Sequence, residues 1–170
     1  MFDLTKLAHR ALVCESNMRL PYICVMIKHV ALPAGSSTMC LDNIFLNGLP
    51  DLVVTGFLSN TAFAGSYRKS PYNFKNFKIK QMDLFSNGMS VPRFGYQPNF
   101  TKKIYNSDNF TFQEQLELDQ GDHCVNLTLK QRADGFNLYS FKISNGPIGR
   151  CTANYRSHAE TGSVRLEFNF

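Results

Sequence analysis

The chain has 170 residues and a mass of 19.3 kDa, which is enough for one domain with a hydrophobic core and too little for two. Hydrophobic residues make up 44% of the sequence and charged residues 18%, which excludes a wholly disordered chain. No apolar stretch approaches the ~18 residues of a membrane span, so none is expected. The 15 Phe and 7 Tyr, with no Trp, favour strands over helices.

The net charge of +5 is unevenly distributed along the chain. Residues 66–103 contain eight basic residues and one acid, Asp83, and therefore carry +7. The basic residues are Arg68, Lys69, Lys75, Lys78, Lys80, Arg93, Lys102 and Lys103, and they are interleaved with Tyr67, Tyr72, Phe74 and Phe77. This pattern predicts either weak contact with DNA or a solvated loop region whose aromatic side chains point into the core. The second interpretation is favoured, because the pI of about 9.0 only reaches the usual threshold for nucleic-acid-binding domains.

The cysteines, at positions 14, 24, 40, 124 and 151, show no C-x-x-C spacing, which argues against a disulfide framework and against structural zinc. Cys24 and Cys40 lie in apolar runs and are expected to be small buried hydrophobes. Residues 1–20 lack the pattern of a signal peptide, so the three glycosylation sequons are expected to be chance matches. These features predict an intracellular protein, in the nucleus or cytoplasm, that is not secreted.

Two strands are predicted in the first third of the chain. Residues 1–21 are expected to form a poorly defined lead-in, and residues 22–170 a single domain. Residues 22–32 (YICVMIKHVAL) are rich in β-branched and aromatic residues and predict a strand, closed by a turn at residues 33–35. Residues 52–58 predict a second strand.

A hairpin is the clearest local signal in the sequence. Its arms are residues 79–86 and 89–91, joined by Asn87-Gly88, which supplies the two positive-φ residues of a type I′ turn. In the first arm the alternation of apolar and polar residues changes phase between Ile79 and Met82, which predicts a bulge around Lys80-Gln81. Pro92 is expected to end the second arm.

The second half of the chain adds two predicted strands and a helix. Residues 94–100 are typical of a long surface connection, and residues 108–118 fit either a strand or a short helix, of which the helix is preferred. Residues 136–143 predict a strand with Tyr139, Phe141 and Ile143 on one face. Residues 163–170 alternate strictly between polar and apolar, which predicts a half-buried strand.

Short strands separated by Gly, Pro and Asn turns predict an all-β fold, either a sandwich or a barrel. The long connections favour Greek-key or jelly-roll wiring over a simple meander. We therefore expect an antiparallel β-sandwich with one or two short helices in the connections.

No catalytic motif is present: the sequence lacks a P-loop, a nucleophile elbow, an H-E-x-x-H zinc motif and a dinucleotide-binding glycine pattern. The densest polar cluster could ligate a metal, but a surface loop is favoured, because ligands so close in sequence cannot all converge on one ion. Its residues are Asp119, Asp122, His123 and Cys124. A Cys–His nucleophile pair could use His9, His29, His123 or His158, although such pairs arise by number alone. We therefore predict no catalytic residue, no cofactor-binding residue and no metal ligand, and hence no enzyme.

Three stretches together carry a family resemblance: residues 32–50 (LPAGSSTMCLDNIFLNGLP), 53–77 (VVTGFLSNTAFAGSYRKSPYNFKNF) and 79–100 (IKQMDLFSNGMSVPRFGYQPNF). They contain, in order, a Pro-x-Gly turn, an A-F-x-G-S-Y turn, an aromatic N-F-x-x-F step, an Asn-Gly hairpin and Pro-x-Phe. Residues 134–143 and 162–168 fit later strands of the same family. Over residues 22–170 the chain resembles the C-terminal jelly roll of the double jelly-roll major capsid protein of Polinton/Maverick elements and adintovirus-like viruses.

This resemblance implies a structural protein of a virion-like shell, which acts by self-association into trimers and with other capsid subunits, without catalysis or cofactor. Family proteins carry two jelly rolls and continue past the strand at residues 164–170, and they read F-D-L-T-P where residues 141–145 read FKISN. The resemblance therefore implies a β-sandwich of jelly-roll type that is incomplete at both ends, a truncated fragment that is non-functional or resident in a host genome. The alternative is a small-ligand or glycan-binding β-sandwich, because jelly rolls also serve as lectins.

Overall fold

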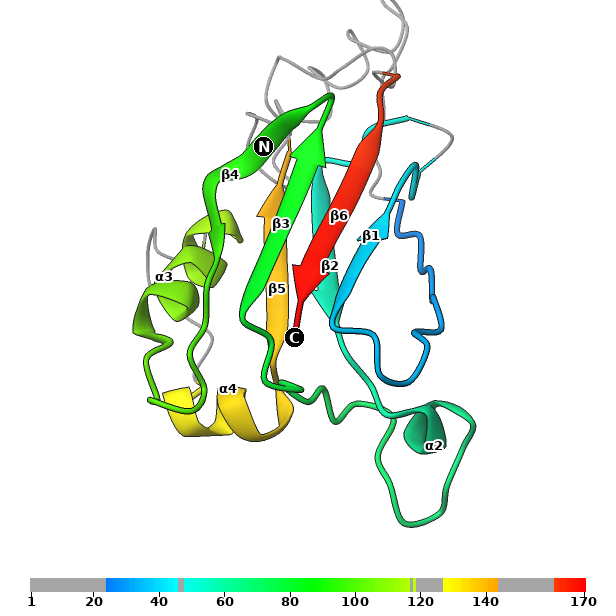
Figure 1. Cartoon of the computed structure of the whole chain (residues 1–170), viewed down its shortest axis with the longest axis vertical. Helices are drawn as coiled ribbons and strands as arrows, with labels where there is room; N and C mark the ends of the chain where they lie inside the picture. The colour runs from blue at the N-terminus through cyan, green and yellow to red at the C-terminus, as the bar shows by residue number, and fades with distance from the viewer. Residues whose placement is uncertain (1–23, 46–47, 117, 119–126, 144–160) are drawn as a thin grey trace, which may run out of the picture.

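Two antiparallel sheets face each other in the computed structural model, which describes residues 24–45, 48–116, 118, 127–143 and 161–170 (Figure 1). The larger sheet has the strand order β1-β6-β3-β4, and the smaller sheet pairs β2 with β5. The strands are β1 (Thr38–Leu41), β2 (Leu52–Gly56), β3 (Gln81–Ser86), β4 (Met89–Tyr96), β5 (Leu138–Lys142) and β6 (Val164–Asn169). This arrangement confirms the antiparallel β-sandwich.

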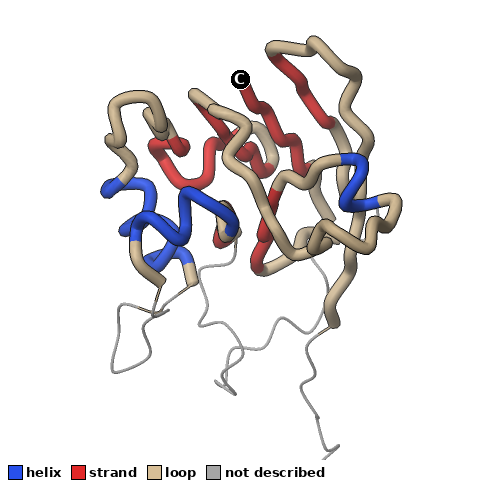
Figure 2. The backbone as a smooth tube through the Cα atoms, turned by 90° about the horizontal axis from the view of Figure 1, so that it is seen from below, coloured by secondary structure: helices blue, strands red, loops and turns tan. Residues whose placement is uncertain are grey.

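Three short helices lie in the connections of the described part of the chain, one more than the upper end of the prediction. They are α2 (Asn60–Phe63), α3 (Asn106–Gln115) and α4 (Leu129–Gly135). The helix preferred for residues 108–118 is therefore confirmed as α3, which begins two residues earlier than predicted. Helices α3 and α4 lie at one side of the sandwich and α2 at the other (Figure 2). The predicted lead-in at residues 1–21 lies outside the described residues.

The strand pairs are nested along the chain. The first strand pairs with the last (β1 with β6), the second with the fifth (β2 with β5), and the third with the fourth (β3 with β4). Successive pairs alternate between the two sheets, and β6 also pairs with β3, which joins the outermost pair to the innermost one. The chain therefore folds as one long antiparallel ribbon that rolls over itself.

The core lies between the two sheets and is built from the alternating residues predicted from the sequence. Val164, Leu166 and Phe168 of β6 are buried, as are Tyr139 and Phe141 of β5. Aromatic contacts join the layers: the ring of Phe57, just after β2, lies 5.3 Å from that of Phe168, and the ring of Tyr96 lies 5.3 Å from that of Phe141. Edge-to-face geometry in both pairs adds to the stabilisation that comes from burial.

The predicted hairpin is present, with its turn at Asn87 (φ 50°) and Gly88 (φ 81°). The prediction of a bulge at Lys80-Gln81 is wrong: the register shifts between Met82 and Leu84, which pair with Tyr96 and Val91, so the extra residues lie in β4 and not in the first arm. The prediction that Pro92 ends the second arm is wrong, because β4 continues to Tyr96. β4 is an edge strand, and the irregular register places Pro92 where no ladder hydrogen bond is needed.

The prediction of a strand at residues 22–32 is wrong for the described part of that range, residues 24–32. Residues 24–32 form no strand, and the side chains of Val25, Ile27 and Val30 are 78%, 87% and 51% exposed. The turn that follows is confirmed, because Gly35 has a φ of 85° and the Ser36 amide donates to the Pro33 carbonyl. Strand propensity is local, whereas a strand also needs a neighbour, and this segment has none among the described residues.

Substitution of a residue between the sheets should destabilise the fold strongly. Phe141→Ala is expected to lower the free energy of unfolding by about 3–5 kcal/mol, because Phe141 is fully buried and contacts the ring of Tyr96. Val54→Ala is the matched control, because Val54 lies in the same sheet but is 49% exposed, and its effect should stay below about 1 kcal/mol. Urea unfolding followed by circular dichroism measures both, and equal effects would contradict the placement of the core.

Candidate interaction surface

An extended apolar segment runs over the surface at residues 24–32, here called the extended segment. It is held to the domain by several contacts: the Lys28 ammonium donates to the Ile44 carbonyl and lies over the Phe45 ring, the His29 ring lies 5.0 Å from that of Phe63 in α2, and Leu32 packs against the core. The side chains of Val25, Ile27 and Val30 nevertheless remain in solvent. A short run rich in β-branched residues, extended and exposed, is suited to pairing with the sheet edge of another chain.

A second feature is a loop rich in aromatic and basic residues at residues 66–80, here called the aromatic loop. Tyr67, Tyr72 and Phe77 recur every five residues and are 107%, 74% and 43% exposed. The interpretation favoured from the sequence, in which the aromatic residues of this region point into the core, is therefore wrong for these three. The five basic residues in the loop are also exposed, and no acid lies between residues 66 and 80.

Backbone contacts fix the second half of the aromatic loop. The Phe74 amide donates to the Gly135 carbonyl (2.8 Å), and the Asn137 amide donates to the Phe74 carbonyl (3.1 Å). The Phe74 ring packs on Gly56 so closely that a Cβ there would lie 2.7 Å from it. The aromatic side chains can point outward because Phe74 and the fully buried Ile79 carry the packing of the loop.

An open hollow of about 400 Å³ lies where the aromatic loop meets α4. It is lined by Lys75, Asn76, Phe77, Lys78, Ala133 and Asp134. The turn that forms it is unusual, because Phe77 and Lys78 both adopt positive φ (43° and 57°), a conformation that bulky residues rarely adopt. The Lys78 amide donates to the Asn76 side chain and the Asn76 amide group donates to the Ala133 carbonyl, so the turn is held in place.

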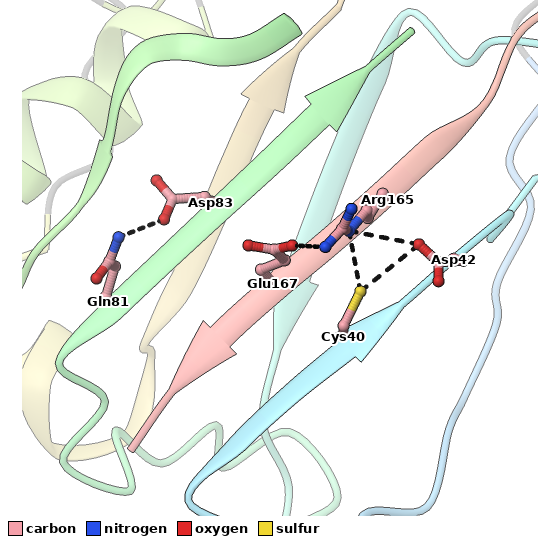
Figure 3. A network of polar contacts seen from close by, with 6 residues as sticks. All are labelled: Cys40, Asp42, Gln81, Asp83, Arg165 and Glu167. Atoms are coloured by element: carbon pink, nitrogen blue, oxygen red, sulfur yellow. Dashed lines mark hydrogen bonds and ion pairs between the residues drawn. The ribbon is translucent and has the colours of Figure 1, made fainter. Parts of the chain in front are cut away.

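The outer face of the large sheet is polar (Figure 3). Arg165 of β6 donates from Nε to the Cys40 sulfur (3.0 Å), lies 3.4 Å from the Asp42 carboxylate, and forms an ion pair with Glu167. The Arg165 side chain is 52% exposed, so these pairs add little to stability, and they keep the face charged. The prediction that Cys24 and Cys40 are buried is wrong, since both are exposed.

A buried polar cluster lies between α3, α4 and β5. The Arg132 guanidinium donates to the carbonyls of Asp108 (3.3 Å) and Leu138 (3.0 Å) and to the Asn109 side chain (2.5 Å). Asp108 Oδ1 accepts from the Gln97 amide, whereas its buried Oδ2 has no hydrogen-bond partner among the described residues. Asp108 lines a cavity of about 10 Å³, which has room for a single water molecule.

The tyrosines beside this cluster are also structural. The Tyr96 hydroxyl donates to the Ser140 carbonyl (2.7 Å), and the Asn137 side chain donates to the Tyr139 hydroxyl (3.0 Å). Burial raises the pKa of both tyrosines, so both are neutral at ordinary pH. The hydrogen bonds of this cluster join helices to strands, and its cavity is too small for a substrate.

Most of the candidates weighed for catalysis or metal binding lie outside the described residues. These are Asp119, Asp122, His123, Cys124, His9 and His158. Of the histidines, His29 is described, and its ring contacts Phe63. Within the described ranges, no group of three or more His, Cys, Asp or Glu side chains could hold a metal ion. Likewise, no helix there is long and apolar enough to cross a membrane.

Comparison with known proteins identifies one distant relative. The chain is 21% identical over 174 aligned residues to an uncharacterized protein of Caenorhabditis elegans. The alignment covers 98% of this chain and 41% of the relative, so the chain spans about two fifths of that protein's length. No family model matches the chain, and no solved structure matches it.

The sequence alone predicted the exposed aromatic and aliphatic side chains only in part. It showed that aromatic and basic residues are interleaved, but it did not show which way their side chains point. The five-residue spacing of Tyr67, Tyr72 and Phe77 is the signal that could have shown it, because it fits neither a buried strand nor a buried helix. The Asp108–Arg132 cluster had no such signal, since its members lie 24 residues apart.

The stability of the protein should depend on the ionisation of Asp108. Burial raises the pKa of Asp108 above its ordinary value of 3.8, so the folded state holds a proton at pH values where the unfolded chain has lost it. The free energy of unfolding should therefore fall as the pH rises from near 4 through the raised pKa of the folded state. In Asp108→Asn this decrease should disappear, and the urea midpoint measured across this pH range tests it.

The matched control is Glu114→Gln, because Glu114 is an exposed carboxylate on the same helix. Its pH profile is expected to follow that of the unmodified protein. An Asp108→Asn profile parallel to the unmodified one would contradict the assignment.

Proposed function

We propose that the protein is a structural protein that acts by self-association into a shell, as the resemblance to the second jelly roll of Polinton/Maverick major capsid proteins implies. The observation that carries this proposal is the extended segment, in which apolar side chains with strand propensity are held in solvent. A monomeric protein gains nothing from exposing them, whereas a subunit gains hydrophobic stabilisation when a neighbour covers them.

The nested strand pairs support the jelly-roll part of the proposal. A jelly roll forms when a long antiparallel ribbon rolls so that its outer pair lies in one sheet and the next pair in the other. The pairs β1–β6, β2–β5 and β3–β4 follow this alternation. The second sheet has two strands among the described residues, against four in the first, which leaves edges where a neighbouring subunit can add strands.

The proposed role requires neither catalysis nor a cofactor. It includes assembly with other subunits as a trimer, and a site of action in a virion-like particle or inside the cell. It also includes the contact of residues 66–103 with nucleic acid, for which the exposed basic residues of the aromatic loop are the supporting observation.

The second candidate is a binding module for a small ligand or glycan, which the open hollow beside α4 favours. One aromatic residue and two lysines are among the residues that line it, a combination suited to a polar ligand. Such a module acts as a monomer, so the oligomeric state separates the two candidates.

The purified chain should associate, and the extended segment should be the cause. Size-exclusion chromatography with light scattering is expected to give three times the 19.3-kDa mass of the chain or a larger assembly. Ile27→Lys should shift the protein to a monomer, because Ile27 is 87% exposed in the extended segment. Met89→Lys is the control, because Met89 is 71% exposed at the hairpin turn, and it should leave the assembly unchanged. A monomer at all concentrations would contradict the proposal.

A further inference from the structure

We propose that the aromatic loop, residues 66–80, binds single-stranded nucleic acid by stacking bases on Tyr67, Tyr72 and Phe77 while its basic side chains contact the phosphates. This inference deepens the nucleic-acid contact in the proposed function, on which it rests, and it does not require self-association. It narrows the contact from residues 66–103 to one loop, and it names the form of nucleic acid.

The aromatic side chains of the loop are exposed enough to stack on bases. Their exposed fractions of 107%, 74% and 43% leave ring faces open to solvent, although burial of such rings is favourable. Proteins that bind single strands use exposed rings of this kind, because every base has a face on which a ring can stack. In a duplex the base faces are covered by their neighbours, so the rings favour a single strand.

The loop is also positively charged, which suits it to contact phosphates. Between the acids Asp51 and Asp83 the chain carries five basic residues, namely Arg68, Lys69, Lys75, Lys78 and Lys80. They alternate with the three exposed rings along the loop, so that each ring has a cationic neighbour within three residues. A phosphate backbone that follows the loop therefore meets positive charge beside each stacked base.

The geometry at the end of the loop brings one aromatic residue and two lysines to the same hollow. Lys75, Phe77 and Lys78 line the open hollow beside α4, and the positive-φ turn that presents them is held by hydrogen bonds of Asn76. Strained backbone of this kind persists where the surroundings enforce it, and it is concentrated at functional sites. Asp134 lines the same hollow, and its negative charge should repel a phosphate. Removal of that charge should therefore strengthen the binding of nucleic acid.

The test is fluorescence anisotropy with a labelled oligothymidylate of about 16 nucleotides, a length within the usual site size of one domain. Tyr72→Ala and Phe77→Ala are each expected to weaken binding at least about fivefold, because loss of one stacked base has roughly that effect. Lys75→Gln with Lys78→Gln should make the dependence of log affinity on log salt shallower by about 1.4. Asp134→Asn should strengthen binding.

The matched control is Phe110→Ala. Phe110 is 61% exposed, but it lies on α3 and outside residues 66–103, so its loss should leave the affinity unchanged. The Ile27→Lys variant should bind as the unmodified chain does, because the extended segment takes no part.

Two results would overturn the inference. If a duplex of the same length binds as tightly, and the tyrosine and phenylalanine variants bind normally, the loop makes only charge contacts and the stacking inference is wrong while the broader contact stands. If no anisotropy change occurs even at low salt, both the inference and the proposed nucleic-acid contact are wrong, and the self-association proposal is unaffected.

Discussion

The packing of β6 against the rest of the sandwich is the constraint on which the structure depends. This strand lies between β1 and β3, so it completes the large sheet and joins the outermost strand pair to the innermost pair. Its inner side chains are buried, and Phe168 contacts Phe57 beside the opposite sheet. Since β1 pairs with β6 and with no other described strand, loss of this register would release β1 as well. Long-range pairing of this kind slows folding, because distant parts of the chain must meet before the pairing stabilises them.

The same rolled ribbon determines where the functional surfaces can lie. The connection from β2 to β3, residues 57–80, crosses from the small sheet to the large one, and it runs over the surface between the buried side chains of Phe57 and Ile79. Phe74 and Ile79 fix this crossing, while the residues between the fixed points project from the domain. Next to the end of this crossing, the Arg132 cluster closes the gap between β5 and the helices with hydrogen bonds. The exposed aromatic and basic side chains of the crossing take no part in that cluster and remain open to solvent.

Much of the fold could be predicted because short stretches of neighbouring residues determine it. The alternation in residues 163–170 and the Asn87-Gly88 turn depend on neighbouring residues alone, and both are confirmed. The extended segment shows the opposite case: residues 24–32 have the composition of a strand, but pairing requires an edge that the sequence does not specify. The exposure of Tyr67 and Tyr72 was missed because composition alone does not distinguish a buried ring from an exposed one, and only the five-residue spacing of these rings carried that information.

The two exposed surfaces depend on salt in opposite ways, because their chemistry differs. The extended segment would associate through apolar area, a driving force that salts excluded from the protein surface strengthen. The aromatic loop would bind through phosphate contacts, which salt weakens steeply, and through stacking, which salt affects little. If both proposals hold, low salt would favour contact with nucleic acid, and a high concentration of an excluded salt such as sulfate would favour contact between subunits. A subunit with both surfaces can hold nucleic acid through one while it assembles through the other, because the two surfaces do not compete for the same side chains.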